Sequence, residues 1–294
     1  MISDGRLQDM ASDLAGVCGV RAVALGGSRA RGTHRPDSDV DLGVYYDEQL
    51  DLVALRELAA RWQGADVAVA APGGWGAWVD GGAWLRVDGV AVDWILRDLR
   101  RVTEQCERAR RGQFAFHQQP GHPLGFLDVS YAGEVATCVP LVDAGGILAE
   151  LAGQVTPYPP ALRASLLRHQ WLVDFLFDAA EKGARKPDVA YVALCATSAV
   201  MLVAHAWHAA AGVWVTNEKG LVPGVANLRL DSAGFAPAAA TILGALGADP
   251  DELATSIGSL RRLPRPSPTD RDIDGDTDGD TDRDTVGDTA GDTG

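Results

Sequence analysis

The chain has 294 residues, of which 47% are hydrophobic, so it can build a sizeable core in two domains or one large one. It has no apolar run of about 18 residues and no basic segment followed by an apolar one at the N-terminus, which argues against a transmembrane helix and a signal peptide. The four cysteines are far apart and form no CxxC pair, so we expect no zinc site or disulfide framework and a cytoplasmic location.

The formal net charge of −14 is unevenly distributed. Residues 270–294 contain ten Asp and two Arg, a net of −8, which leaves −6 for the rest of the chain. A protein that grips a nucleic-acid backbone usually has a basic surface. We therefore expect a cationic or neutral small molecule, or another protein, as the partner, and neither RNA nor DNA.

The first part of the chain predicts helices and strands in alternation. Apolar residues at helical or alternating spacing predict a helix over 6–18, strands over 20–25 and 40–46, a helix over 52–62, strands over 67–71, 84–87 and 90–96, and a charged helix over 98–112. The strands over 84–87 and 90–96 form a hairpin, because Asp88-Gly89 is a strong turn dipeptide. We expect an α+β domain over residues 1–112, with a small mixed sheet and flanking helices.

The second part predicts helices only. Ala, Leu and Val recur at helical spacing and prolines punctuate them, which places helices near 133–153, 160–183, 188–212, 235–246 and 250–262. These helices predict an α-helical bundle domain over residues 113–263. Residues 264–294 repeat Gly-Asp-Thr with almost no apolar residues, which predicts a disordered acidic tail.

A glycine-rich turn, Gly26-Gly27-Ser28, follows the first predicted strand. Glycines let a backbone come close to a phosphate, and Ser28 is a good N-cap for a short helix whose free N–H groups face phosphate oxygens. Arg29 or Arg31 adds positive charge. The turn lacks the Gly-Lys-Ser/Thr of a Walker P-loop, so a different kind of phosphate site is indicated.

Three aspartates lie on predicted strands. Asp39 and Asp41 alternate with apolar residues and share one face of a strand, and Asp93 lies between apolar neighbours on a later strand. Carboxylates side by side repel each other unless a cation bridges them. Magnesium suits such ligands and takes its remaining ligands from water and substrate phosphates, so this pattern favours metal-assisted phosphoryl transfer over a solvated acidic turn.

The turn, the Asp39-Val40-Asp41 motif eleven residues after Ser28, and Asp93 together resemble the nucleotidyltransferase superfamily, which includes DNA polymerase beta and the aminoglycoside nucleotidyltransferases. The helical half resembles the companion domain of kanamycin-nucleotidyltransferase-like proteins. The resemblance implies transfer of a nucleoside monophosphate from an NTP to a hydroxyl of a small-molecule acceptor, with release of pyrophosphate. It also implies site residues: a nucleotide at Gly26, Gly27, Ser28 and Arg29, and Mg²⁺ on Asp39, Asp41 and Asp93.

The helical half offers further candidates. Glu134 and Glu218 are candidates for the general base, a role that Asp93 would otherwise take. Lys219 is a candidate for contact with the triphosphate; the alternative is that its segment is only a turn between helices. His205 and His208 are interpreted as packing residues. Three readings stay open beside small-molecule transfer: a protein nucleotidyltransferase of the antitoxin type, a degenerate nucleotide sensor, and a sugar transferase, which leaves the glycine turn unexplained.

Overall fold

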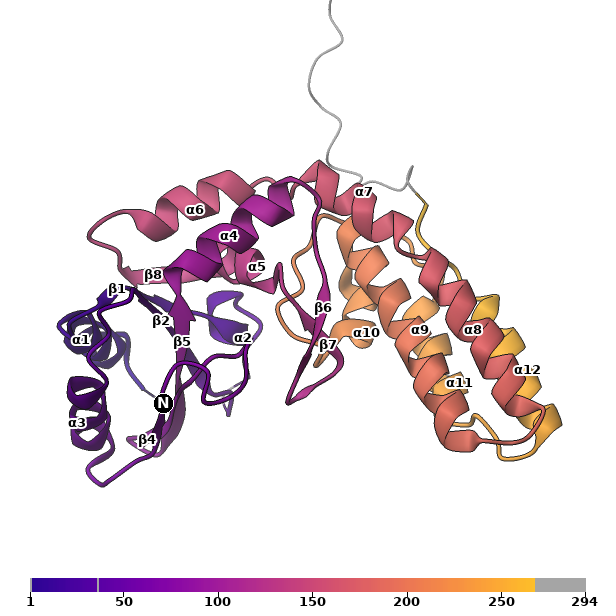
Figure 1. Cartoon of the computed structure of the whole chain (residues 1–294), viewed down its shortest axis with the longest axis horizontal. Helices are drawn as coiled ribbons and strands as arrows, with labels where there is room; N and C mark the ends of the chain where they lie inside the picture. Colours follow the sequence, from indigo (N-terminus) through magenta and orange to yellow (C-terminus); the bar gives the residue numbers. More distant parts are fainter. Residues whose placement is uncertain (1, 36, 268–294) are drawn as a thin grey trace, which may run out of the picture.

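The computed structural model describes residues 2–35 and 37–267. The first part contains α1 (Asp4–Ala15), β1 (Val20–Leu25), α2 (Gly27–Ala30), β2 (Val40–Tyr46), α3 (Leu52–Gln63), β3 (Val69–Ala70), β4 (Gly82–Val87), β5 (Val90–Asp98) and α4 (Leu99–Arg110) (Figure 1). All of these elements were predicted, although β3 is shorter than the strand predicted over 67–71 and α2 begins before Ser28. The predicted disordered tail falls largely on residues 268–294, which lie outside the described residues.

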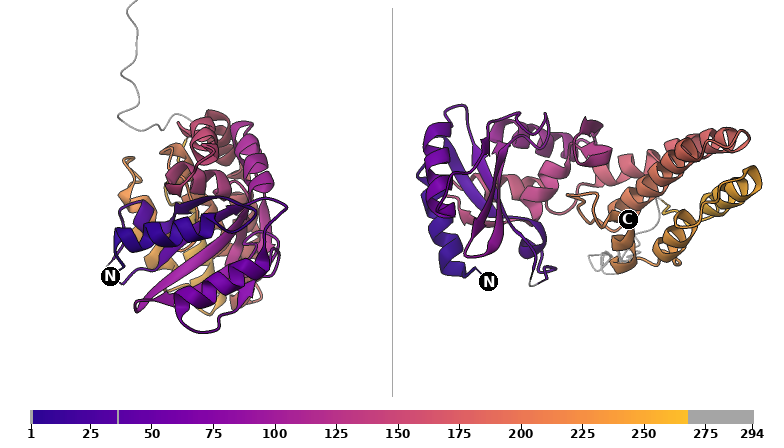
Figure 2. Two further views of the ribbon diagram at one scale, coloured as in Figure 1. Left: turned by 90° about the vertical axis from the view of Figure 1, so that its left-hand side faces the viewer. Right: turned by 90° about the horizontal axis from the view of Figure 1, so that it is seen from below.

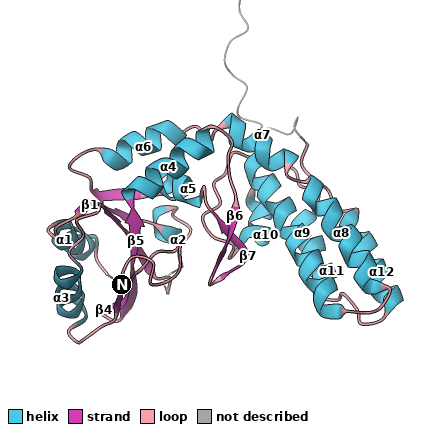
Figure 3. Cartoon of the chain, viewed as in Figure 1, coloured by secondary structure: helices cyan, strands magenta, loops and turns pink. Residues whose placement is uncertain are grey.

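The second part, as far as residue 267, contains three strands among its helices, whereas the sequence predicted helices there. It contains β6 (Phe116–Gln119), β7 (His122–Leu127), α5 (Ser130–Thr137), β8 (Val139–Val142), α6 (Ile147–Val155), α7 (Pro160–Arg168), α8 (Trp171–Ala184), α9 (Val189–Ala210), α10 (Leu221–Gly224), the 3₁₀ turn Val225–Asn227, α11 (Phe235–Leu243) and α12 (Pro250–Arg261). The strands gather in one half of the molecule and the long helices in the other (Figure 3).

A six-stranded mixed sheet forms the centre of the first part, with the strand order β3-β4-β5-β2-β1-β8. Strand β2 pairs parallel with β5 and antiparallel with β1. On one face, alternate residues of β2 such as Leu42 and Val44 pack against α1 and α3. The opposite face carries Asp41, Gly43 and Tyr45, and Tyr45 packs against the layer of α4, α5 and α6. The mixed α+β sheet predicted from the sequence is confirmed.

The predicted helix over 133–153 is wrong, because strand β8 interrupts it. Strand β8 pairs antiparallel with β1, so that Val139 lies opposite Leu25 and Val142 opposite Val23. Pro140 cannot continue a helix, but the outer edge of a sheet tolerates a residue without an N–H group. The chain thus returns to the sheet well after residue 112. Strands β6 and β7 form an antiparallel hairpin that the sequence did not predict.

The long helices form the far end of the molecule (Figure 2). Helix α9 is long and apolar enough to cross a membrane by length and composition alone. In this fold it is the central helix of the bundle, and residues such as Val192, Ala196 and Val203 form a core with α8 and α12. The loop that follows α9 runs back toward the sheet and reaches the site described next.

Candidate functional site

A cleft of about 900 Å³ lies where the sheet meets the loop after α9. Its lining comes from the turn after β1, the loop before β2, the open face of β2 and β5, helix α5, and residues 216–220. Most of the residues that the sequence singled out line it together: Gly26, Gly27, Ser28, Asp39, Asp41, Glu134 and Lys219.

The glycine turn is fitted closely to Asp41. The Gly26 N–H donates a hydrogen bond to the Asp41 carbonyl oxygen at 2.8 Å, which ties the end of β1 to β2. Gly27 has φ +61°, and a Cβ atom there would lie 1.8 Å from Asp41 Oδ2. Only glycine fits this position, both because of its backbone conformation and because the carboxylate occupies the space of a side chain.

Ser28 is not the N-cap that the sequence predicted. Helix α2 begins two residues earlier than predicted, at Gly27, and its N-cap is Gly26. A Cβ atom at Gly26 would lie 3.7 Å from the Asp41 carbonyl oxygen, an ordinary contact, so the close fit to Asp41 is at Gly27 and not at the capping position. The helix has only four residues, so any contact with phosphate depends on local N–H groups and the Ser28 hydroxyl rather than on a helix dipole.

Arg29 and Arg31 have different roles. The Arg29 guanidinium donates to the carbonyl oxygens of Ser38 at 2.6 Å and Asp39 at 3.0 Å, so it holds the loop before β2. Arg29 is not among the residues that line the cleft, whereas Arg31 and Arg35 are. Arg31 also donates to Thr216 Oγ1 at 3.2 Å and thereby connects this loop to the segment after α9. The cations of this side of the cleft are therefore Arg31 and Arg35.

Strand register brings the carboxylates together. In the parallel pair, Asp41 of β2 lies directly opposite Asp93 of β5, and Asp39 comes immediately before β2. Burial, followed by repulsion from Asp39 and Glu134, raises the pKa of Asp41. Burial, followed by repulsion from Asp41 and Asp39, raises the pKa of Asp93 to about 6. The site concentrates negative charge that the neighbouring side chains do not neutralise.

A divalent cation is the group that this charge would suit. Among residues 2–35 and 37–267, no three His, Cys, Asp or Glu side chains are gathered closely enough to hold a metal ion on their own. The donor set nevertheless fits Mg²⁺, which prefers carboxylate oxygens and keeps several ligands from water or phosphate. The aspartates could therefore supply only part of the ligands of such an ion, and water or a bound phosphate would have to supply the rest.

Glu134 is held by an arginine that the sequence analysis missed. Arg97 of β5 donates from Nε to Oε2 at 2.6 Å and from Nη2 to Oε1 at 2.8 Å. Burial opposes the charge on Arg97, but the Glu134 carboxylate outweighs it and raises the Arg97 pKa. An arginine in a largely apolar strand was the available signal, since such a charge requires a buried partner.

Glu218 is also engaged, by backbone groups. Its carboxylate accepts hydrogen bonds from the N–H groups of Gly125 at 3.1 Å and Leu124 at 3.4 Å, both in β7. This contact fixes the segment after α9 against the β6–β7 hairpin. The next residue, Lys219, lines the cleft opposite the glycine turn. Glu218 therefore anchors the segment that carries Lys219, instead of facing the cleft as a free base.

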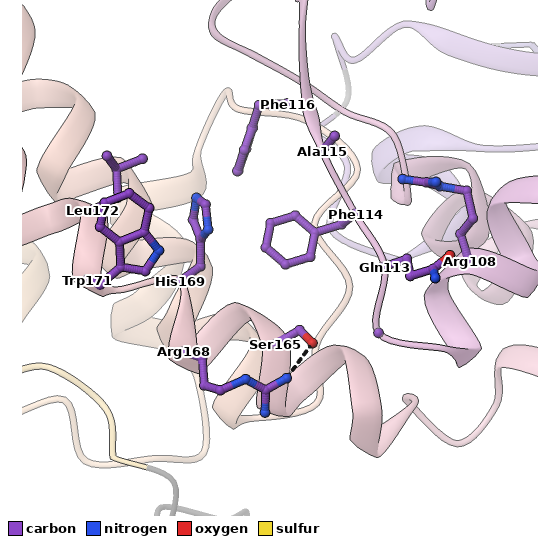
Figure 4. A pocket seen from close by; sticks show the side chains of 11 residues that line it. Arg108, Gln113, Phe114, Ala115, Phe116, Ser165, Arg168, His169, Trp171 and Leu172 are labelled. Carbon is purple, nitrogen blue, oxygen red and sulfur yellow. Dashed lines mark hydrogen bonds between the residues drawn. The ribbon is translucent and has the colours of Figure 1, made fainter.

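The remaining residues of interest pack away from the cleft. His205 and His208 are buried in α9, as predicted. A second hollow, of about 830 Å³, is lined by Phe114, Phe116, His169 and other residues of β6 and of α7 and α8 (Figure 4). It contains none of the predicted site residues, and we assign it no role in the chemistry.

Residues 7–70 match the family model of the nucleotidyltransferase domain. The matched segment contains the glycine turn, Asp39 and Asp41 but not Asp93, and it supports the superfamily resemblance. Among solved structures, the chain is similar to a nucleotidyltransferase-like protein from Exiguobacterium sibiricum 255-15, at 12% sequence identity and a TM-score of 0.43, over 87% of this chain and 73% of that one. The comparison with curated proteins found no match.

Proposed function

We propose that this protein is a magnesium-dependent nucleotidyltransferase of the cytoplasm. It would move a nucleoside monophosphate from an NTP to a hydroxyl of a small-molecule acceptor and release pyrophosphate. One observation carries the proposal: the glycine turn closes around Asp41, which is paired in register with Asp93 and lines a cleft together with Arg31, Arg35 and Lys219. The family match supports the general reaction and leaves the acceptor to this proposal.

The nucleotide would occupy the side of the cleft formed by the glycine turn. Gly26, Gly27 and Ser28 offer backbone and hydroxyl groups to the triphosphate there. Arg31 from one side and Lys219 from the other would neutralise its charge. The contact between Arg31 and Thr216 supports this arrangement, because it joins the two sides across the opening.

Asp39 and Asp41 would hold the metal, with Asp93 as the third carboxylate. When bound, Mg²⁺ would neutralise phosphate charge and make the α-phosphorus more open to attack. Asp93 pairs with Asp41 but is not among the residues that line the cleft; in this proposal it would assist or accept the proton of the acceptor hydroxyl. Glu134 is not given the role of base in this proposal, because both of its oxygens accept hydrogen bonds from Arg97.

The segment after α9 supports a small acceptor over a protein acceptor. Thr216, Asn217 and Lys219 line the cleft from the side opposite the sheet. A side chain on the surface of another protein would have to enter between these residues and the carboxylates. A free small molecule meets no such restriction, so we favour it over the antitoxin type of reaction.

The test follows the label of an α-³²P-labelled NTP into acceptors, together with the release of pyrophosphate. We expect the Asp39→Ala/Asp41→Ala double variant to lose both the transfer of the label and the release of pyrophosphate. Asp47→Ala is the matched control, because Asp47 follows the same strand but pairs with Arg21 at the surface. Undiminished turnover in the double variant would refute the proposal. Nucleotide binding without pyrophosphate release from the wild type would identify a degenerate sensor.

A further inference from the structure

We infer that the acceptor is an uncharged hydroxyl compound rather than a polycationic aminoglycoside, and that Arg97 sets this preference by neutralising Glu134. The inference rests on the proposed function and concerns the acceptor half of the same cleft. We define the acceptor half as the part of the lining formed by Tyr45, Val79, His122, Phe126, Glu134 and Thr137, together with Arg97 beneath them.

The pair formed by Arg97 and Glu134 carries no net charge and cannot easily separate. Besides its two bonds to the carboxylate, the guanidinium donates to the carbonyl oxygens of Val79 at 3.2 Å and Leu96 at 3.1 Å. The side chains of Arg97 and Glu134 are 6% and 23% exposed. A guanidinium held at four points in a buried position does not move aside to free the carboxylate for a ligand.

Glu134 is the one carboxylate among the described residues of the acceptor half. An acceptor with several ammonium groups needs several unpaired carboxylates, because each desolvated cation requires a partner. Elsewhere in the lining, Asp39 and Asp41 belong to the metal site of the proposed function. Asp37 lies in the loop that also brings Arg31 to the cleft. The acceptor half therefore offers a polycation no free negative charge.

The other walls of the acceptor half are aromatic or neutral. The Phe126 ring lies with its centroid 5.1 Å from that of His122, in an edge-on arrangement, and stacks 5.8 Å from Trp78. Burial lowers the pKa of His122, which keeps its imidazole neutral near pH 7. Thr137 adds a hydroxyl group. Such a surface suits the apolar face of a ring and a few hydroxyl groups.

The test compares two compounds with the same hydroxyl groups, kanamycin A and its fully N-acetylated, uncharged derivative. Their binding is measured by calorimetry with the wild type saturated with Mg²⁺ and a non-hydrolysable ATP analogue. We expect the acetylated compound to bind at least as tightly as kanamycin A. Binding of kanamycin A that is about tenfold tighter would overturn the inference.

Variants of Arg97 provide the second readout. Freed of Arg97, Glu134 becomes an available carboxylate, so Arg97→Met should bind kanamycin A at least about tenfold more tightly than the wild type, and Arg97→Met/Glu134→Gln should lose this gain. A folded Arg97→Met variant that binds kanamycin A no more tightly than the wild type would contradict the inference. This comparison decides the question even if neither compound binds the wild type. Arg97→Gln takes its place if melting curves show that Arg97→Met is unfolded.

Failure of the proposed function gives a different result. A fluorescent ATP analogue added with Mg²⁺ reports nucleotide binding independently of the acceptor. Absence of nucleotide binding to the wild type would refute the proposed function itself. Normal nucleotide binding with a preference for kanamycin A would refute only the inference about the acceptor.

Discussion

Replacement of Gly27 by alanine tests the contact on which the proposed nucleotide site depends. Gly27 has φ +61°, and an added Cβ would lie 1.8 Å from Oδ2 and 2.7 Å from Cγ of Asp41. Gly32 is the matched control, because it lies in the same region with φ +67° and has no atom within 4 Å of an added Cβ. Both variants place an alanine at a positive φ angle, but only the alanine at position 27 would collide with the Asp41 side chain.

The backbone cost is about 1–2 kcal/mol for an alanine in the left-handed conformation, so Gly32→Ala should lower the free energy of unfolding by that amount. In Gly27→Ala the collision is with the end of a side chain, which can rotate away. The additional loss of stability should therefore stay near the lower end of the usual overpacking cost of about 1–3 kcal/mol. The rotation removes the Asp41 carboxylate from its position beside Asp93.

The larger effect is expected on function. A displacement of about 1 Å in a reacting group costs on the order of 10²-fold in rate, so Gly27→Ala should lose turnover by at least that factor while Gly32→Ala keeps it within a few-fold. The measurements are urea unfolding, pyrophosphate release and binding of a fluorescent ATP analogue with Mg²⁺. Equal nucleotide binding and turnover in the two variants would show that the fit between Gly27 and Asp41 has no functional role.

Three other predictions concern buried groups and an anchor. Glu134→Ala leaves the Arg97 charge buried without its partner and should lower the free energy of unfolding by about 3 kcal/mol in urea titrations. Burial lowers the pKa of His205 to about 3, so the folded state excludes a proton that the unfolded state binds below pH 6.5. The stability that depends on neutral His205 is complete above pH 6.5 and falls toward pH 3 by about 1.4 kcal/mol per pH unit. His205→Leu should remove this pH dependence of the free energy of unfolding. A pH profile of stability that is the same in the variant and the wild type would contradict the prediction. Glu218→Ala should raise KM for the NTP more than it lowers kcat, because the segment carrying Lys219 loses its anchor; equal KM values would argue against the anchor.

Local patterns predicted the sheet domain well. The strands β1 and β2 and the hairpin of β4 and β5 follow from alternation and from the Asp88-Gly89 turn, and their parallel or antiparallel pairing places the predicted carboxylates together. Strand β8 was missed because four residues are too few for periodicity to distinguish a strand from a helix. Pro140 was the local signal that a helix could not continue there.

Side-chain partners across long sequence separations were beyond local patterns. Arg97 and Glu134 are 37 residues apart, and neither spacing nor composition indicates that they meet. Arg29 and Arg31 are two residues apart on one short helix turn, yet only the fold decides that the first binds carbonyl groups of its own loop and the second faces the cleft. The types of residue in the sequence indicated the chemistry of the site, but only the tertiary structure shows which of these side chains line the cleft.

The parallel pairing of β2 with β5 explains why the domain tolerates its cluster of carboxylates. A slip of one residue would turn Asp41 or Asp93 into the apolar core formed with α1 and α3, so the buried residues on the opposite face fix the register. Within that register the two carboxylates must lie side by side, although their repulsion and burial disfavour the ionised forms. The fold therefore gives up some stability to hold these carboxylates together, and a ligand that includes a divalent cation, such as a magnesium–triphosphate complex, would relieve their repulsion and stabilise the folded protein.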